Sequence, residues 1–542
     1  MSKTYRPYTP GQSFLLPPSP LDWLPEDHLA RFILDIVQAL DLKAITSYYE
    51  REYRGFPPHH PVMMTALLVY AYCVGVPSSR KIEKRTHEDI AFRVITGNTH
   101  PNYSCISEFR RIHLQALREL FVQVLVLCEE MGLTQLGMVA LDGTKMQANA
   151  SKHKAMSYDR MQADEARLAA KVAELLKLAD QVDQAEDEQF GAGRRGDELP
   201  EDLRRAQSRL ERIRQTKEQL EAQVQQQAQA RAAKQSEEYQ VALALTEMNN
   251  ILAARQDLGE PLQTPAPLKT TGTATSQPDA QEPQEAPAPT EADEPHEMQQ
   301  APSLQRQTSA ETEMEAPQAP PQESRVLLPT PEPLPLHQHS TQPGELPGPK
   351  AQRNFTDSES RILKSGNGYV QGYNAQIAVD PECQIIVACG VSNQSPDAEY
   401  FIPMVDRIVE NMGRPPLKAV ADAGYFSEAN IQRASSRGVD PYIAPGRTGH
   451  GKKAEENLSE VQATEASAKA RMKSKLSTEE GARIYSRRKV IVEPVFGQIK
   501  NRGFRQFLLR GLEKVSGEWS LVALSHNLLK LHSARKAGQK AA

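Results

Sequence analysis

Apolar residues recur every three to four positions along the first 135 residues, a spacing that predicts amphipathic helices. The segment PEDHLARFILDIVQALDL (25–42) begins with proline and acids and carries its apolar residues on one face. PVMMTALLVYAYCVG (61–75) and SCISEFRRIHLQALRELFVQVLVLCEEMG (104–132) show similar patterns and end at glycine. We therefore expect an all-helical domain over residues 1–135. It is either a DNA-binding module that displays Arg110 and Arg111 or a helical packing domain.

Residues 158–255 have a heptad pattern. Leu203, Leu210, Lys217 and Val224 are seven residues apart, and a second apolar series runs between them. An earlier series begins at Met161, and FGAGRRGDELP (190–200) between the two has the glycines and proline that reverse a chain. This pattern predicts an antiparallel helical hairpin, with intermolecular coiled-coil pairing as the alternative.

Residues 256–350 hold nineteen of the thirty-nine prolines, no Phe, Tyr or Trp, and many more acids than bases. Such a segment cannot bury enough apolar surface to offset the entropy cost of ordering it. We expect a disordered, acidic, Pro-rich linker.

Short apolar strand patterns alternate with helical ones over residues 351–512. GYVQGYNAQIAVD (368–380) and CQIIVACGVS (383–392) predict a hairpin joined by a tight turn, and LKAVADAG (417–424) and DPYIAPG (440–446) predict further strands separated by a helix. LGMVALDG, in the segment 136–157, supplies the first strand, and residues 513–542 form a C-terminal helix. The order is that of an α/β, RNase H-like mixed sheet with helices on both faces, interrupted by the insertion at 158–350.

Composition narrows the class of protein. Five cysteines without a C-x-x-C pair argue against a zinc ribbon and a disulfide framework, and no apolar run is long enough to span a membrane. We therefore expect a cytoplasmic protein. The net charge of −5 conceals a basic C-terminal part, since residues 481–542 contain thirteen Lys or Arg and three acids. This asymmetry indicates a polyanionic partner.

Two apolar runs each stop on an aspartate, Asp142 in GMVALDGTK and Asp422 in KAVADAGYF. In open α/β sheets, reactive groups gather beyond the carboxyl ends of strands, and carboxylates there bind hard cations such as Mg²⁺. Glu493 is the candidate third acid, because it lies within a basic helical segment, YSRRKVIVEPVFGQIKNRGFRQF. Two similar acids have simpler explanations: Asp380 is a turn residue, and Asp397 is an acid at a helix N-terminus.

These motifs make the chain resemble a bacterial insertion-sequence DDE transposase, of the RNase H-like superfamily and the branch with a Tyr-Arg-Glu-Lys signature. The matching segments are ALDGTK, ADAGYFSE and YSRRKVIVEPVFGQIK, in which Glu493 and Lys500 keep the family's spacing. Tyr485 is one position further from Glu493 than usual, and Lys489 stands in the arginine position with Arg488 beside it. Pro494 disfavours helical geometry at Glu493, which predicts that the helix begins or kinks there.

The resemblance implies a function. Asp142, Asp422 and Glu493 would be catalytic and would hold two Mg²⁺ ions, with Mn²⁺ as a substitute, for cleavage and strand transfer at the terminal inverted repeats. The double-stranded DNA of the element ends and of the target would be the partner, and two protomers would form the synaptic complex. Basic and aromatic residues would contact the DNA: Tyr485, Arg487, Arg488, Lys489, Lys500, Arg502 and Arg505, with Arg110 and Arg111 in the N-terminal domain. The alternatives are a decayed or domesticated DNA-binding relative and a coiled-coil scaffold.

Overall fold

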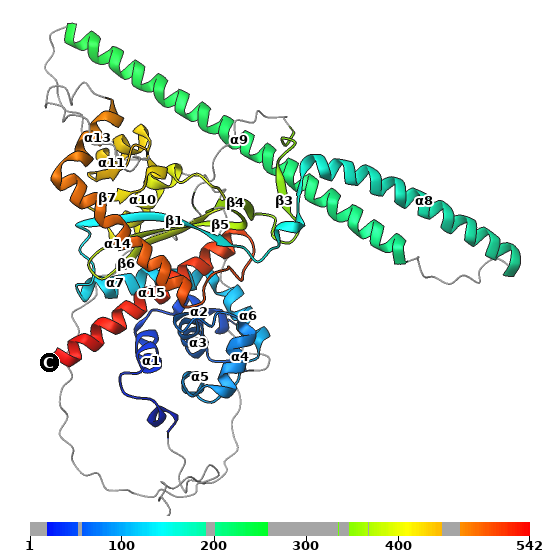
Figure 1. The fold of residues 1–542 in the computed structure, drawn as a ribbon, viewed down its shortest axis with the longest axis horizontal. Coiled ribbons are helices and arrows are strands. Elements are labelled where there is room, and N and C mark those ends of the chain that lie inside the picture. The colour runs from blue at the N-terminus through cyan, green and yellow to red at the C-terminus, as the bar shows by residue number, and fades with distance from the viewer. Residues whose placement is uncertain are drawn as a thin grey trace, which may run out of the picture. The chain divides into compact units, whose positions relative to one another are not determined.

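The computed structural model describes residues 19–51, 57–190, 201–257, 334, 346–366, 368–446 and 467–541 (Figure 1). Nearly all of the expected linker at 256–350, and most of the expected chain reversal at 190–200, lie outside these residues. The chain divides into a main unit, Met1–Lys234 with Leu328–Ala542, and a second unit, Gln235–Leu327. All sites discussed below belong to the main unit.

The N-terminal region is helical. Its central helix, α3, is apolar all round and is buried from Met64 to Cys73. The C-terminal helix α15 packs against α3 and α7, so these helices and the sheet share one hydrophobic core. The bounds are η1 Pro20–Trp23, α1 Leu29–Ala39, α2 Lys43–Tyr49, α3 Pro61–Cys73, α4 Ser79–Glu88, α5 Ile90–Ile95, α6 Tyr103–Ile112, α7 Leu114–Glu130 and α15 Leu512–Ala541.

A mixed sheet forms the centre of the main unit. Strand β1 pairs antiparallel with β5 and parallel with β7, and β7 pairs parallel with β8. The other edge of β5 pairs with β6 and, further towards its start, with β4. This is the RNase H-like arrangement that the order of elements predicts. The strands are β1 Met138–Gln147, β4 Arg361–Ser365, β5 Gly368–Asp380, β6 Ile385–Ser392, β7 Lys418–Ala421 and β8 Asp440–Ile443.

Helices from the second half of the chain cover this sheet. Helices α10 and α15 pack against β6, and α14 packs across β1, β7 and β8. Fully buried Trp519 of α15 donates its indole N–H to the Gln376 carbonyl of β5 at 3.0 Å. The remaining elements are η3 Ala398–Tyr400, α10 Phe401–Met412, η4 Ala423–Tyr425, α11 Glu428–Ser436, α13 Ala468–Ser477 and α14 Glu479–Asn501.

The insertion after β1 begins as an antiparallel helical hairpin, formed by α8 (Tyr158–Phe190) and α9 (Glu201–Asp257), drawn in cyan and green in Figure 1. Tyr158 donates a hydrogen bond to Glu221, and Glu165 pairs with Lys217 at 2.9 Å. Heptad positions of both helices, among them Met161 and Ile213, are buried in one cluster. Strands β2 (Ala155–Ser157) and β3 (Gln352–Asn354) pair at the base of the hairpin.

The chain has only two tryptophans, and their burial differs sharply: Trp519 is fully buried and Trp23 is 43% exposed. We expect Trp519→Ala to lower the free energy of unfolding by about 3–5 kcal/mol, because it leaves a large cavity and removes the hydrogen bond to the Gln376 carbonyl. Trp23→Ala is the matched control and should cost less than about 1 kcal/mol. Urea unfolding measures both, and equal losses would contradict the position of Trp519 in the core.

Candidate active site

The centre of the candidate site is the point where β1 and β7 separate. Their parallel pairing ends at Leu141 and Ala421, and an aspartate follows immediately in each chain segment. The sequence suggested that both strands end there, but β1 continues to Gln147, paired only with β5. Asp142 therefore lies within a strand, while Asp422 follows the end of β7. Both carboxylates are placed at the crevice where neighbouring strands diverge, as in other open α/β sheets.

Asp142 is a mostly buried carboxylate, with 19% of its side chain exposed. Its Oδ1 accepts a hydrogen bond from the Gly143 amide at 2.8 Å, and its Oδ2 accepts one from Arg488 Nη1 at 3.2 Å. Burial raises its pKa to about 6, and the nearby carboxylates of Asp422 and Asp397 raise it as well. Carboxylates that lie close together, with one of them largely shielded from water, favour the presence of a cation.

Asp422 is held by a tight turn. Its Oδ1 accepts a hydrogen bond from the Gly424 amide at 2.8 Å and so caps η4. A Cβ atom on Gly424 would lie 2.9 Å from that same oxygen, so a larger residue there would displace the carboxylate. Tyr425 is fully buried and donates its hydroxyl to Gln376 of β5, which fixes η4 against the sheet. The sequence ADAGY therefore encodes the position of this carboxylate.

Asp397 is the acid whose place in the site the sequence did not reveal. It precedes η3, but its side chain forms no cap hydrogen bond. Its carboxylate instead accepts hydrogen bonds from Asn374 at 2.7 Å and Gln376 at 2.9 Å, and it pairs with Lys145 at 3.2 Å. The available signal was the polar pair Asn374 and Gln376, fully buried within a strand, where polar groups need partners.

Helix α14 crosses the site and places three of the predicted DNA-contact residues there. Arg488 is only 9% exposed and faces Asp142, and Lys500 donates a hydrogen bond to Thr144 Oγ1 at 2.8 Å. Burial raises the pKa of Tyr485, and both aspartates are near enough to raise it further. The helix runs from Glu479 to Asn501 with Pro494 inside it, so of the two predicted alternatives it does not begin at Glu493. Val490, whose carbonyl would otherwise bond to residue 494, is 70% exposed.

Glu493 does not join the aspartates in this structure. Its side chain is exposed, and it has no hydrogen bond or ion pair within the described part of the chain. Among the described residues, no three His, Cys, Asp or Glu side chains form a group that could hold a metal ion. The expected convergence of Asp142, Asp422 and Glu493 is thus not present, because Arg488 is the residue that α14 turns towards Asp142. Glu493 lies between Arg488 and Lys500 along the helix, about two turns before Lys500 and on the same arc.

The remaining predicted DNA contacts differ in exposure. Arg487, Lys489 and Arg505 are exposed, whereas Arg502 binds the Gln498 carbonyl and His526. Arg111 is exposed and pairs with Glu108 on its own helix.

Arg110 was expected on an exposed, DNA-facing side of its helix, and the structure places it in the interior. It is 5% exposed, and its guanidinium donates to the Tyr72 hydroxyl at 3.1 Å and to the Pro77 carbonyl at 2.9 Å. Tyr72 in turn donates to the buried carboxylate of Glu518 in α15. Arg110 is therefore a structural residue that connects α3, α6 and α15, and it is not available to DNA in this conformation.

Comparison with known protein families supports the resemblance to DDE transposases that the sequence motifs indicate. Residues 334–528 match the model described as Transposase DDE domain, and residues 18–111 match that described as Transposase domain (DUF772). The chain belongs to the insertion-sequence DDE transposases. The matched DDE segment contains Asp422 and Glu493, whereas Asp142 and the α8–α9 hairpin of this transposase lie outside both matches. Membership of the Tyr-Arg-Glu-Lys branch stays a prediction.

No curated protein and no solved structure matches the transposase significantly. Within its described helices, no stretch is both long and apolar enough to cross a membrane. Its family identifies it as a protein of DNA transposition that acts on DNA, and DDE transposases generally use divalent metal ions.

The raised pKa of Asp142 gives a testable pH dependence. The folded state holds the Asp142 proton up to about pH 6, whereas the unfolded state releases it near 3.8. The stability of the wild-type protein should therefore fall as pH rises between these values, by about 3 kcal/mol for this group alone. Asp142→Asn should avoid that loss and be the more stable protein at neutral pH.

Urea unfolding of the two proteins across this pH range, without divalent cations, measures the effect. Asp159→Asn, which removes an exposed carboxylate at the start of α8, is the control. A difference between wild type and Asp142→Asn that does not grow from about pH 4 to about pH 6 would contradict the raised pKa.

Proposed function

We propose that this transposase binds the terminal inverted repeats of its element, cuts the DNA there and joins the freed 3′ ends to target DNA. The carrying observation is the pair Asp142 and Asp422 at the divergence of β1 and β7, with a pKa of Asp142 that is raised by burial and by neighbouring carboxylates. Two neighbouring carboxylates, one of them mostly removed from water, are costly unless a cation or a proton accompanies them. Phosphodiester cleavage that depends on Mg²⁺ is the chemistry that such a pair serves.

The donor atoms of the site fit a hard divalent cation. Asp142 and Asp422 offer carboxylate oxygens, which Mg²⁺ prefers, and Mg²⁺ usually takes one or two carboxylates together with substrate phosphates. Bound there, such a cation would polarise the scissile phosphate and lower the pKa of an attacking water. The pairing of Asp142 with Arg488 supports this assignment, because the guanidinium supplies positive charge at the position where the carboxylate needs it.

We infer that Glu493 is the third acid and that it approaches the pair when DNA is bound. It shares a helical arc with Lys500, which already contacts Thr144, two residues after Asp142 on β1. To place Glu493 above Asp142, α14 would have to rotate as well as slide, because Arg488 and Glu493 are separated by about 7.5 Å along the helix and by about 140° around it. Released from Asp142, Arg488 would become free to contact a DNA phosphate, as would Lys500 on leaving Thr144.

The chain's own residues would position the DNA around this centre. Arg487, Lys489 and Arg505 expose positive charge on or directly after α14 and suit phosphate contacts. Tyr485 lies beside both aspartates and would fix the backbone at the cut. Two protomers would pair two DNA ends. Between Met161 and Leu220 the hairpin buries its own apolar seam, so the contact between protomers would use another surface.

Asp422→Asn tests the assignment of the catalytic pair. We expect loss of Mg²⁺-dependent nicking of a duplex that carries the element's end, with binding of the same duplex within about threefold of wild type, because the change removes one cation ligand and no phosphate contact. Asp440→Asn, at the opposite end of the neighbouring strand β8, is the matched control and should still nick. Nicking by Asp422→Asn at the wild-type rate would overturn the proposal.

Glu493→Gln tests the third acid separately. The side chain is exposed and has no partner in the described structure, so the thermal stability of this variant should match wild type. Cleavage should nevertheless fall by at least about a hundredfold, in keeping with loss of a group that acts at the reacting centre. Glu479→Gln, at the first position of the same helix, is the control. Full cleavage by Glu493→Gln would remove this residue from the catalytic set.

A further inference from the structure

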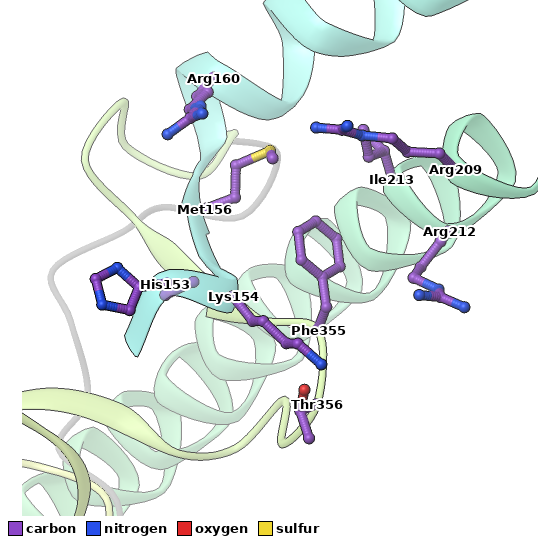
Figure 2. Close-up of a pocket in the computed structure, with 10 residues that line it drawn as sticks. His153, Lys154, Met156, Arg160, Arg209, Arg212, Ile213, Phe355 and Thr356 are labelled. Carbon is purple, nitrogen blue, oxygen red and sulfur yellow. The ribbon is translucent and has the colours of Figure 1, made fainter. Parts of the chain in front are cut away.

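A basic cavity lies at the base of the hairpin insertion, away from the acidic pair. It has a volume of about 310 Å³ and lies between η2 (Lys152–Lys154) with β2, the start of α8, α9, and the turn after β3 (Figure 2). Met156, Ile213 and Phe355 form its apolar part, and Figure 2 shows the Phe355 ring standing near its centre. Four cationic side chains line it: Lys154, Arg160, Arg209 and Arg212. We call this site the basic pocket.

The positive charge of the basic pocket is largely uncompensated. Arg209 approaches Asp164 at 3.8 Å. Within the described part of the chain, the side chains of Lys154, Arg160 and Arg212 have no hydrogen bond or ion pair. By contrast, Arg214 and Lys217, two and five residues after Arg212 on α9, are both paired with Glu165. Cations that surround a cavity without acids repel one another and attract an anion.

The charge also continues beyond the basic pocket along α9. A second, more open hollow of about 410 Å³ is lined by Ser208 and four arginines of that helix, including Arg209 and Arg212 of the basic pocket. Arg205, Arg209 and Arg212 follow the spacing of three to four residues that places them on one face of the helix. An extended row of cations suits an extended polyanion better than a single small phosphate.

The basic pocket is near the candidate active site along the chain. Lys154 follows Asp142 by a dozen residues, which span at most about 43 Å even when fully extended. One turn of duplex DNA is about 34 Å long. A duplex held at Asp142 therefore needs to run little more than one turn to reach the basic pocket.

We propose that the basic pocket and the adjoining arginine row of α9 bind the phosphate backbone of the DNA on which the acidic pair acts. This inference rests on the proposed function and adds a contact through cationic residues that neither transposase family match covers. Lys154, Arg160 and Arg212 contact phosphate oxygens, and Phe355 and Met156 form the apolar wall beside the sugar. The contact is independent of base sequence and holds the duplex against the hairpin.

The test measures how DNA affinity depends on salt. Full-length wild type and the double variant Arg160→Gln/Arg212→Gln are titrated against a fluorescent mixed-sequence duplex at several KCl concentrations. Each lost phosphate contact lowers the slope of log K against log salt by about 0.9, so the double variant should have a slope shallower by about two. The double variant Lys171→Gln/Lys177→Gln, which removes two exposed cations of α8 outside the pocket, is the matched control and should keep the wild-type slope.

The outcomes separate this inference from the proposed function. An unchanged slope in the Arg160→Gln/Arg212→Gln variant, with Lys154→Gln also unchanged, overturns the role of the basic pocket while leaving cleavage at Asp142 and Asp422 intact. An equal loss of slope in the α8 control overturns it as well, since the effect would then follow net charge alone. If a labelled mononucleotide binds wild type and loses affinity in the arginine variant while duplex binding does not change, the pocket is a small-phosphate site. Failure of wild type to bind any duplex would overturn both proposals.

Discussion

The candidate site depends on the point at which β1 and β7 stop pairing. While the two strands run in parallel, each backbone satisfies the other and leaves no room for a ligand. Directly after Leu141 and Ala421 they separate, and two carboxylates lie at the opening. The antiparallel partner β5 holds β1 in place beyond that point, so Asp142 sits on a rigid element instead of on a loop. A site built on strands in this way keeps its geometry with little loss from thermal motion.

The electrostatics of the site follow from that placement. Burial and neighbouring acids make the charged form of Asp142 unfavourable, and Arg488 offsets part of the cost. In this structure the Arg488 guanidinium therefore faces the Asp142 carboxylate. Asp397 adds a third negative group, but Lys145 and two buried amides already hold it, which suits a supporting role in fixing the loop before α10.

The sequence predicted the fold, and it predicted that Asp142 and Asp422 lie next to each other's strands, since both follow from local patterns. Apolar runs that end on an acid identified Asp142 and Asp422, and the order of strand and helix patterns identified the sheet. The continuation of β1 past Asp142 was missed because TKMQ is polar enough to suggest a turn, and only its pairing with β5 keeps it extended. Arg110 and Arg488 were both taken for exposed DNA contacts. Spacing along a helix shows which residues share a face. It does not show that the Tyr72 hydroxyl lies opposite Arg110 or that the Asp142 carboxylate lies opposite Arg488. Pro494 was expected to start or kink the helix. It is accommodated inside α14 because the turn around Val490, whose carbonyl loses its helical hydrogen bond, is exposed to water.

The long interval between β1 and its partner β5 has a consequence for synthesis of the protein. Gln147 pairs with Gly372, so more than two hundred residues must leave the ribosome before β1 can be covered. At about 5–20 residues per second, this takes roughly 10–50 s. Throughout that time an apolar strand with two unpaired edges is open to other nascent chains, and such edges favour aggregation. The α8–α9 hairpin forms from contacts close in sequence and can fold within this interval. A pause in translation anywhere between Gln147 and Gly372 would prolong the exposure of β1 and should increase aggregation.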